Sequence, residues 1–195
     1  MSTYSLHDAI RNEDLETVKL LIKNGTDIET LDKYNKAPLH VAVIYRNSEI
    51  VKLLIESGAR LEESADPEGC ANINILDKYN NTLLHMAAMH RNSEVAKLLI
   101  ERGRTEGSPE ASLRVGANIE ALDPYNNTPL HIAAMYGKLE VVKLLTERGA
   151  NIEALDKYNN TPLHMAAQYG KSKVVKLLIE RGANVDVLDK YKFTY

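Results

Sequence analysis

Apolar residues along positions 128–149 have the spacing of two short amphipathic helices. In the first, Leu130, Ala133 and Ala134 fall on one face, and the two small alanines allow a neighbouring helix to approach closely. In the second, an apolar stripe at positions i, i+1, i+3 and i+4 is backed by charged residues. The pattern therefore predicts a pair of helices joined by a turn.

Local signals predict where these helices begin and end. The hydroxyl of Thr128 can cap the first helix, and Pro129 suits the first helical position, where a missing N–H costs nothing. Gly137 ends the first helix, and Gly149, a residue suited to a left-handed C-cap, ends the second. These residues therefore predict the start and the end of the first helix and the end of the second.

An extended arm is expected between one predicted helix pair and the next. Ile152 and Leu155 bracket one such arm, and an Asn, which tolerates positive φ, stands at the turn of each. The arm is therefore predicted to be a short hairpin loop. The turn residues are Asn35, Asn80, Asn126 and Asn159.

The helix pair is part of a repeat. Residues 123–155 and 156–188 are identical at 24 of 33 aligned positions. A Leu-His marker recurs at His7, His40, His85, His131 and His164, in steps of 33, 45, 46 and 33 residues. The predicted array spans residues 1–195 as units 1–31 (an N-terminal cap), 32–76, 77–122, 123–155 and 156–188, with insertions 59–70 and 104–116 and a partial hairpin at 189–195.

A helix pair of this size cannot cover its own apolar faces, so each unit is expected to stack on the next. The motifs "TPLHIAA", "VVKLL" and "GANIEALD", with Gly at the turn between the helices, recur at a period of 33 and resemble the ankyrin repeat over residues 5–192. The resemblance implies an all-α repeat solenoid of helix–turn–helix units with short β-hairpin loops. Four residues depart from the pattern: Ala37 replaces the capping Thr, Leu83 the Pro, and Arg46 and Arg91 the Gly.

The two ends of the array differ from its middle. The first unit lacks the hairpin and the Thr-Pro pair, as an N-terminal cap would. Residues 189–195 begin a sixth hairpin without a following helix. The chain is therefore expected to be a truncated piece of a longer one, or to have a partner covering that end. Its expected oligomeric state is a monomer, with end-to-end contact between chains as the alternative.

Charge and cysteine content narrow the classes of partner and compartment. The formal net charge of −3 gives no bulk attraction to nucleic acid or to anionic membranes. Cys70 is the only cysteine, so an intrachain disulfide and a cysteine zinc site are both excluded. Because charges interrupt the N-terminal apolar residues, the chain is predicted to be cytoplasmic, or delivered into a host cytosol without a classical signal peptide.

No motif points to catalysis. A Gly-rich phosphate loop, a nucleophile elbow and "HExxH" are all absent from the sequence. Five of the six histidines are repeat-equivalent, and stacked helices about 8–10 Å apart hold neighbouring imidazoles too far apart to share a zinc ion. The resemblance implies that these histidines link adjacent hairpins by hydrogen bonds. The chain is therefore predicted not to be an enzyme and to bind no cofactor and no metal. A deep polar pocket containing His90 or Cys70 would favour an enzyme instead.

The unusual feature is tyrosine, with ten Tyr against one Phe and no Trp. One set precedes the turn Asn of each hairpin, and a second set, with His90 in one unit, follows the alanines of the first helix. The resemblance places both sets on the concave surface, which in ankyrin proteins commonly contacts partners. The predicted protein-binding residues, with the side chains beside them, are Tyr34, Ile44, Tyr45, Tyr79, Met89, His90, Tyr125, Met135, Tyr136, Tyr158, Gln168 and Tyr169.

Rows of Tyr with Ile and Met on an open groove have the composition of a protein-binding surface. The main hypothesis is therefore a non-catalytic module that binds another protein through this Tyr-rich groove. The alternative is a structural fragment or an engineered consensus-type scaffold, in which the Tyr were copied with the duplicated unit. The two insertions are a second candidate for binding, or loops that are merely tolerated.

Overall fold

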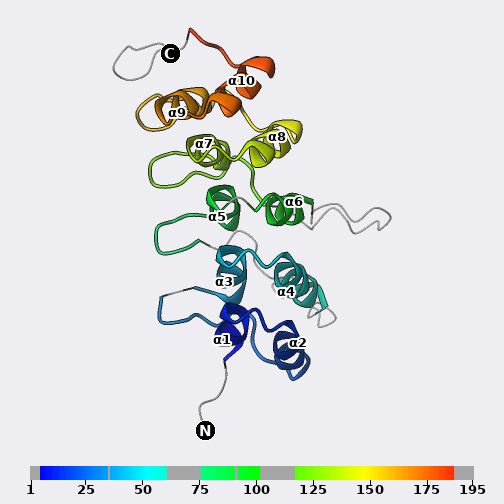
Figure 1. Ribbon diagram of the computed structural model, residues 1–195. Helices are drawn as coiled ribbons and strands as arrows, with labels where there is room; N and C mark the ends of the chain where they lie inside the picture. The colour runs from blue at the N-terminus through cyan, green and yellow to red at the C-terminus, as the bar shows by residue number, and fades with distance from the viewer. Residues whose placement is uncertain (1–4, 35, 61–75, 91, 102–116, 187–195) are drawn as a thin grey trace, which may run out of the picture.

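The structure is a computed structural model that describes residues 5–34, 36–60, 76–90, 92–101 and 117–186 (Figure 1). Most of the insertion 59–70, all of the insertion 104–116, residues 189–195, Asn35 and Cys70 lie outside these ranges. The predictions made for those segments therefore stay predictions, as does the division into units.

The described residues form ten helices in two alternating sets. The first helices, which open each pair, are α1 (Leu6–Arg11), α3 (Pro38–Ile44), α5 (Leu83–Met89), α7 (Pro129–Met135) and α9 (Pro162–Gln168). The second helices, which close each pair, are α2 (Leu15–Lys23), α4 (Ser48–Arg60), α6 (Ser93–Glu101), α8 (Leu139–Glu147) and α10 (Ser172–Glu180).

The helix pairs stack in one direction. Each first helix contacts the first helix of the next pair, and each second helix contacts the next second helix. The result is two columns, with the loops projecting from the first helices on the side away from the second helices (Figure 1). The all-α repeat solenoid predicted from the sequence is thereby confirmed.

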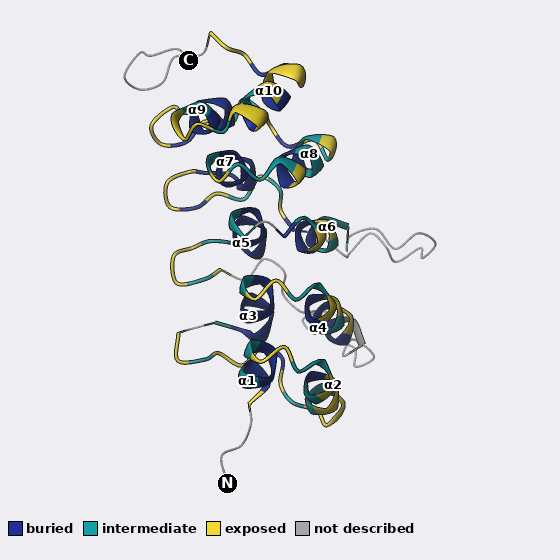
Figure 2. Cartoon of the chain, viewed as in Figure 1, coloured by how far each residue is buried: buried dark blue, intermediate teal, exposed yellow. Residues whose placement is uncertain are grey.

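Small residues bring the first helices together. Leu130, Ala133 and Ala134 of α7 are fully buried between neighbouring helices, as their shared face predicts. On α8 the side chains of Val141 and Leu145 are also buried. Buried residues therefore run through both columns from one end of the stack to the other (Figure 2).

The helix caps follow the predicted signals. The side chain of Thr128 accepts a hydrogen bond from the backbone N–H of His131, and Pro129 stands in the first turn of α7. Ala37, which replaces this Thr ahead of α3, makes no side-chain cap. Gly137 has a φ of 67°, and Arg46, at the equivalent position, adopts 60° in spite of its Cβ. The second helix α4 is longer than the sequence pattern predicts, since it continues two residues into the predicted insertion 59–70.

The loops are tighter than the predicted β-hairpins. Among the described residues no strand forms, and Leu76 and Thr82 make an isolated antiparallel bridge. In the loop at 156–160, Asp156 N–H donates to Asn160 O at 3.0 Å and Asn159 N–H donates to Asp156 O at 3.0 Å. Asn80, Asn126 and Asn159 turn the chain with φ near 60°, as predicted. Each loop is thus a turn without a ladder, because its arms are too short to pair further.

Three of the marker histidines, His7, His85 and His131, link their helix pair to the loop of the next, as the family resemblance implied. Nδ1 of His131 accepts the backbone N–H of Thr128 at 3.1 Å, so its Nε2 carries the proton and donates to Asn160 O at 3.0 Å. His85 makes the equivalent bond to Asn127 O at 3.0 Å, and His7 to Lys36 O at 2.9 Å. These imidazoles are therefore structural.

This role makes stability depend on pH. Burial lowers the pKa of His85 and His131 below the ordinary value of 6.5, against the opposing pull of the loop carbonyls. Below pH 6.5 these two imidazoles bind protons in the unfolded chain but stay neutral in the folded chain. The free energy of unfolding is therefore expected to fall as the pH drops below 6.5. Each histidine contributes a slope of at most about 1.4 kcal/mol per pH unit, measurable by urea denaturation at a series of pH values.

The matched control for this prediction is H85Q/H131Q, in which neither side chain titrates. Its unfolding free energy is expected to be lower throughout and to depend less on pH between about 7 and 5. A slope equal to that of the wild type in this range would show that the two imidazoles are not the source.

Candidate protein-binding groove

A groove of about 740 Å³ runs across three successive first helices and their loops. Its floor comes from α5, α7 and α9, and its wall comes from the loops at 77–81, 123–127 and 156–160. Its lining residues are Asn81, Met89, Asp123, Tyr125, Asn127, Ile132, Met135, Asp156, Tyr158, Asn160, Met165, Gln168 and Tyr169.

The groove brings together half of the predicted site. Six of the twelve predicted residues line it: Met89, Tyr125, Met135, Tyr158, Gln168 and Tyr169. The other six, Tyr34, Ile44, Tyr45, Tyr79, His90 and Tyr136, are described but are not among its lining residues. All seven of the predicted Tyr side chains are exposed, from 39% for Tyr158 to 62% for Tyr79, and none is packed between layers.

Buried carboxylates hold the loop tyrosines in place, and the sequence analysis did not anticipate them. Oδ1 of Asp123 accepts the backbone N–H groups of Tyr125 at 2.7 Å and Asn127 at 2.8 Å, while Oδ2 accepts Asn127 Nδ2 at 2.9 Å. Asp156 holds Tyr158 and Asn160 in the same way. The available signal was the Asp two residues before the Tyr in every loop, a spacing typical of an Asx turn.

Lysines lie on the loop tyrosines, a second feature that the sequence analysis missed. Lys157 Nζ is 3.6 Å from the ring centroid of Tyr125 and 5.0 Å from that of Tyr158, so one cation bridges two neighbouring loops. Its backbone N–H also donates to Tyr125 O at 2.9 Å. The Lys directly before the Tyr in the sequence was the signal that could have found this contact.

Comparison with known proteins decides the family. A family model described as ankyrin repeats (three copies) matches residues 6–108 and 107–189. The chain belongs to the ankyrin-repeat family. Ankyrin repeats generally mediate protein–protein interaction, and the family is typically non-catalytic. A comparison with curated proteins found no match.

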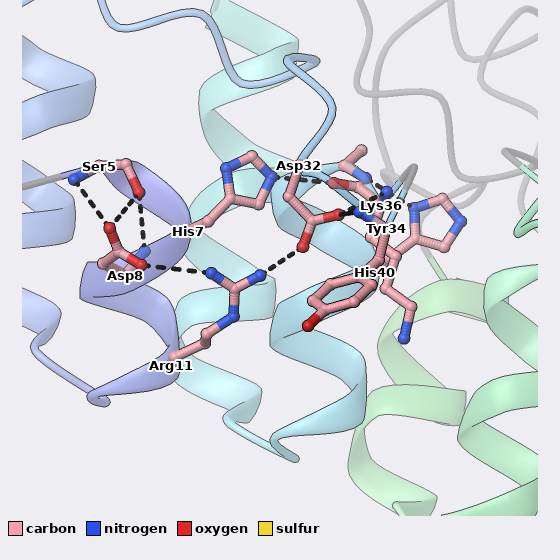
Figure 3. A network of polar contacts seen from close by, with 9 residues as sticks. Ser5, His7, Asp8, Arg11, Asp32, Tyr34, Lys36 and His40 are labelled. Atoms are coloured by element: carbon pink, nitrogen blue, oxygen red, sulfur yellow. Dashed lines mark hydrogen bonds and ion pairs between the residues drawn. The ribbon is translucent and has the colours of Figure 1, made fainter.

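The first pair of the ankyrin stack is polar where the later pairs are apolar. Arg11 occupies the position that Ile44, Met89 and Met135 take in later pairs, and it forms ion pairs with Asp8 and Asp32 (Figure 3). Burial raises the pKa of Asp32, but the N–H donors of the loop and the Arg11 charge outweigh it, so the pKa is lowered overall. This end of the stack is therefore held by an ionic network.

His90 takes the place of a Tyr in the row that follows the alanines. Burial lowers the pKa of this half-buried imidazole, and the positive charges of Arg46, Lys138 and Lys36 lower it further. Its surroundings on this ankyrin face are thus cationic, and a neutral His90 is favoured at pH 7.

The ankyrin stack was also searched for metal-binding and membrane-spanning features. Over the described ranges, no group of three or more His, Cys, Asp or Glu side chains is placed to hold a metal ion. In the same part of the chain, no helix is both long and apolar enough to cross a bilayer.

The carboxylate of Asp156 gives a test of how the loop is held. Asp156→Ala leaves two backbone N–H groups and one amide without their acceptor, so the free energy of unfolding is expected to fall by about 2 kcal/mol in urea denaturation. Asp156→Asn keeps one acceptor oxygen and is expected to recover part of the loss.

The control is Asp27→Ala, which removes an exposed carboxylate that accepts the Glu29 N–H at 2.8 Å. Because both groups are at the surface, this change is expected to cost well under 1 kcal/mol. Equal losses for the two alanine variants would contradict a structural role for the buried carboxylate.

Proposed function

We propose that this chain is a non-catalytic module that binds a segment of a partner protein in the groove lined by Met89, Met135, Tyr125, Tyr158 and Tyr169. The proposal rests on the family, whose repeats mediate protein–protein interaction, and on the composition of the groove. The partner lies across the first helices of three successive pairs and contacts the loop tyrosines on one side.

The observation that carries the proposal is a groove in which the stack leaves part of the apolar surface of Met89 and Met135 uncovered. Met89 and Met135 are only half-buried, although they belong to the same helices as the fully buried alanines. Met fills irregular partner surfaces because its side chain is flexible and polarisable. Tyr adds a large contact area with a polar tip and loses little conformational entropy on binding.

The loop contacts support the same proposal. Asp123 and Asp156 fix the backbones of Tyr125 and Tyr158, and the carboxylates themselves are held by buried hydrogen bonds. A wall that is ordered before binding reduces the entropy that association costs. The loops therefore present their tyrosines to a partner without first having to fold.

The alternative is a structural or engineered scaffold without a native partner. The 24 identical positions in the last two full repeats favour it, because duplication copies a Tyr whether or not the Tyr binds anything. The two hypotheses differ in one measurable property, which is dependence of partner capture on the groove tyrosines.

That dependence is tested with Tyr125→Ala/Tyr169→Ala. Tyr125 belongs to the loop wall and Tyr169 follows α9, and both are about half exposed. Truncating two aromatic contacts is expected to weaken capture of partner proteins by at least about tenfold. The measurement is quantitative affinity capture from a lysate of the source organism, compared with wild type.

The matched control is Leu20→Ala, which truncates a similarly exposed apolar side chain on α2, outside the groove. It is expected to capture the same proteins as wild type, and circular dichroism checks that both variants are folded. Proteins that are held equally by wild type and by the Tyr variant would place binding elsewhere. A wild-type chain that captures nothing would support the scaffold alternative.

A further inference from the structure

The groove is bordered by cations that lie on its tyrosines. Lys157 contacts the rings of Tyr125 and Tyr158, both of which line the groove. The row continues along the loops toward the N-terminus, where Lys78 Nζ lies 4.8 Å from the Tyr79 ring centroid and Lys33 Nζ 5.0 Å from that of Tyr34. One border of the face therefore alternates aromatic rings and positive charges.

Further cations lie around His90, beside the groove. Lys138 Nζ lies 5.6 Å from the ring centroid of Tyr136, at the end of α7. Arg46, Lys138 and Lys36 are the charges that act on His90, next to the groove residue Met89, and all three are positive. Cations thus lie both on the loop tyrosines and around His90.

The carboxylates that line the groove are already occupied as hydrogen-bond acceptors. Asp123 and Asp156 line the groove, but both are buried and are occupied by the backbone N–H groups of their own loops. Asp77 is occupied in the same way by Tyr79 N–H and Asn81 N–H. The negative groups therefore point into the loops and the positive groups lie at the surface.

Most of the ion pairs of the described residues lie on or directly after the second helices. There Lys143 pairs with Glu140 at 2.9 Å, and Arg181 with Glu147 at 3.1 Å. Among the described residues, by contrast, none of the ion pairs involves Lys33, Lys78 or Lys157. The three lysines beside the loop tyrosines are therefore exposed cations that no ion pair of the described residues occupies.

From these exposed lysines and the apolar floor of the groove we infer that the groove takes an acidic peptide segment, whose apolar side chains contact Met89 and Met135 and whose carboxylates contact the lysines beside the loop tyrosines. The inference rests on the proposed function and adds the chemistry of the partner. Each loop lysine has one side on a ring and its remaining N–H donors available to a carboxylate. A protein segment fits better than nucleic acid, because the floor of the groove is made of Met and Ile side chains.

The test begins by selecting random 12-residue peptides, displayed on phage, against the immobilised chain. Enriched sequences are synthesised, and their affinities are measured by fluorescence anisotropy. The expected peptides are net negative with interspersed apolar residues. Raising NaCl from about 50 to about 500 mM is expected to weaken their binding, because exposed charges are screened.

The decisive variant is K78E/K157E, which reverses two charges beside the loop tyrosines. It is expected to bind the selected peptides about tenfold more weakly than wild type. The matched control, K97E/K173E, changes the net charge equally on exposed positions of α6 and α10 and is expected to bind like wild type. Thermal melts verify that both are folded.

The possible outcomes distinguish a failure of this inference from a failure of the proposed function. Neutral or basic peptides that lose binding to Tyr125→Ala/Tyr169→Ala overturn the acidic partner and leave the groove as the site. Acidic peptides that bind all variants equally, or a selection without enrichment, overturn both. A labelled single-stranded oligonucleotide that binds wild type but not K78E/K157E overturns the choice of a peptide.

Discussion

No helix pair in this chain can bury its apolar faces alone, and contact between successive pairs is the constraint on which the structure depends. Ala133 and Ala134 are fully buried only because a neighbouring first helix lies against them. The same contact brings the His131 imidazole to the carbonyl of Asn160 in the following loop. Stability is therefore shared along the stack, and the position of each loop is set by the helix pair before it.

The groove follows from this constraint. Stacking fixes the spacing of the first helices, and the Asp carboxylate of each loop fixes its Tyr relative to the helix that follows. The surface left over is a row of side chains that no repeat covers, with Met135 on the floor and Tyr158 on the wall. Because loops and helices are held by buried polar groups, the shape of this surface exists before a partner arrives.

Much of the fold could be predicted because its signals are local. The Thr128 cap, the turn at Asn126 and the apolar face of α7 depend on residues within a few positions of one another. The site could be predicted only in part. That six of the twelve residues share one groove depends on how three pairs are oriented, and the Lys157–Tyr125 contact joins residues of two different loops. The role of Asp156 was missed although its signal is local, since the Asp stands two residues before the Tyr in the sequence.

The two kinds of position in a repeat are under different physical demands, and the chain itself shows the result. The marker histidine is the same in all five repeats, and at His85 and His131 its imidazole accepts from its own cap and donates to the next loop. The position four residues later, which lines the groove as Met89, Met135 and Gln168, differs in nearly every repeat: Arg11, Ile44, Met89, Met135 and Gln168. None of these five side chains is buried, so the stack constrains their chemistry less than it constrains that of the histidine. The residues that line the groove can therefore differ, and with them the selectivity for a partner, while the residues that hold the stack together stay the same.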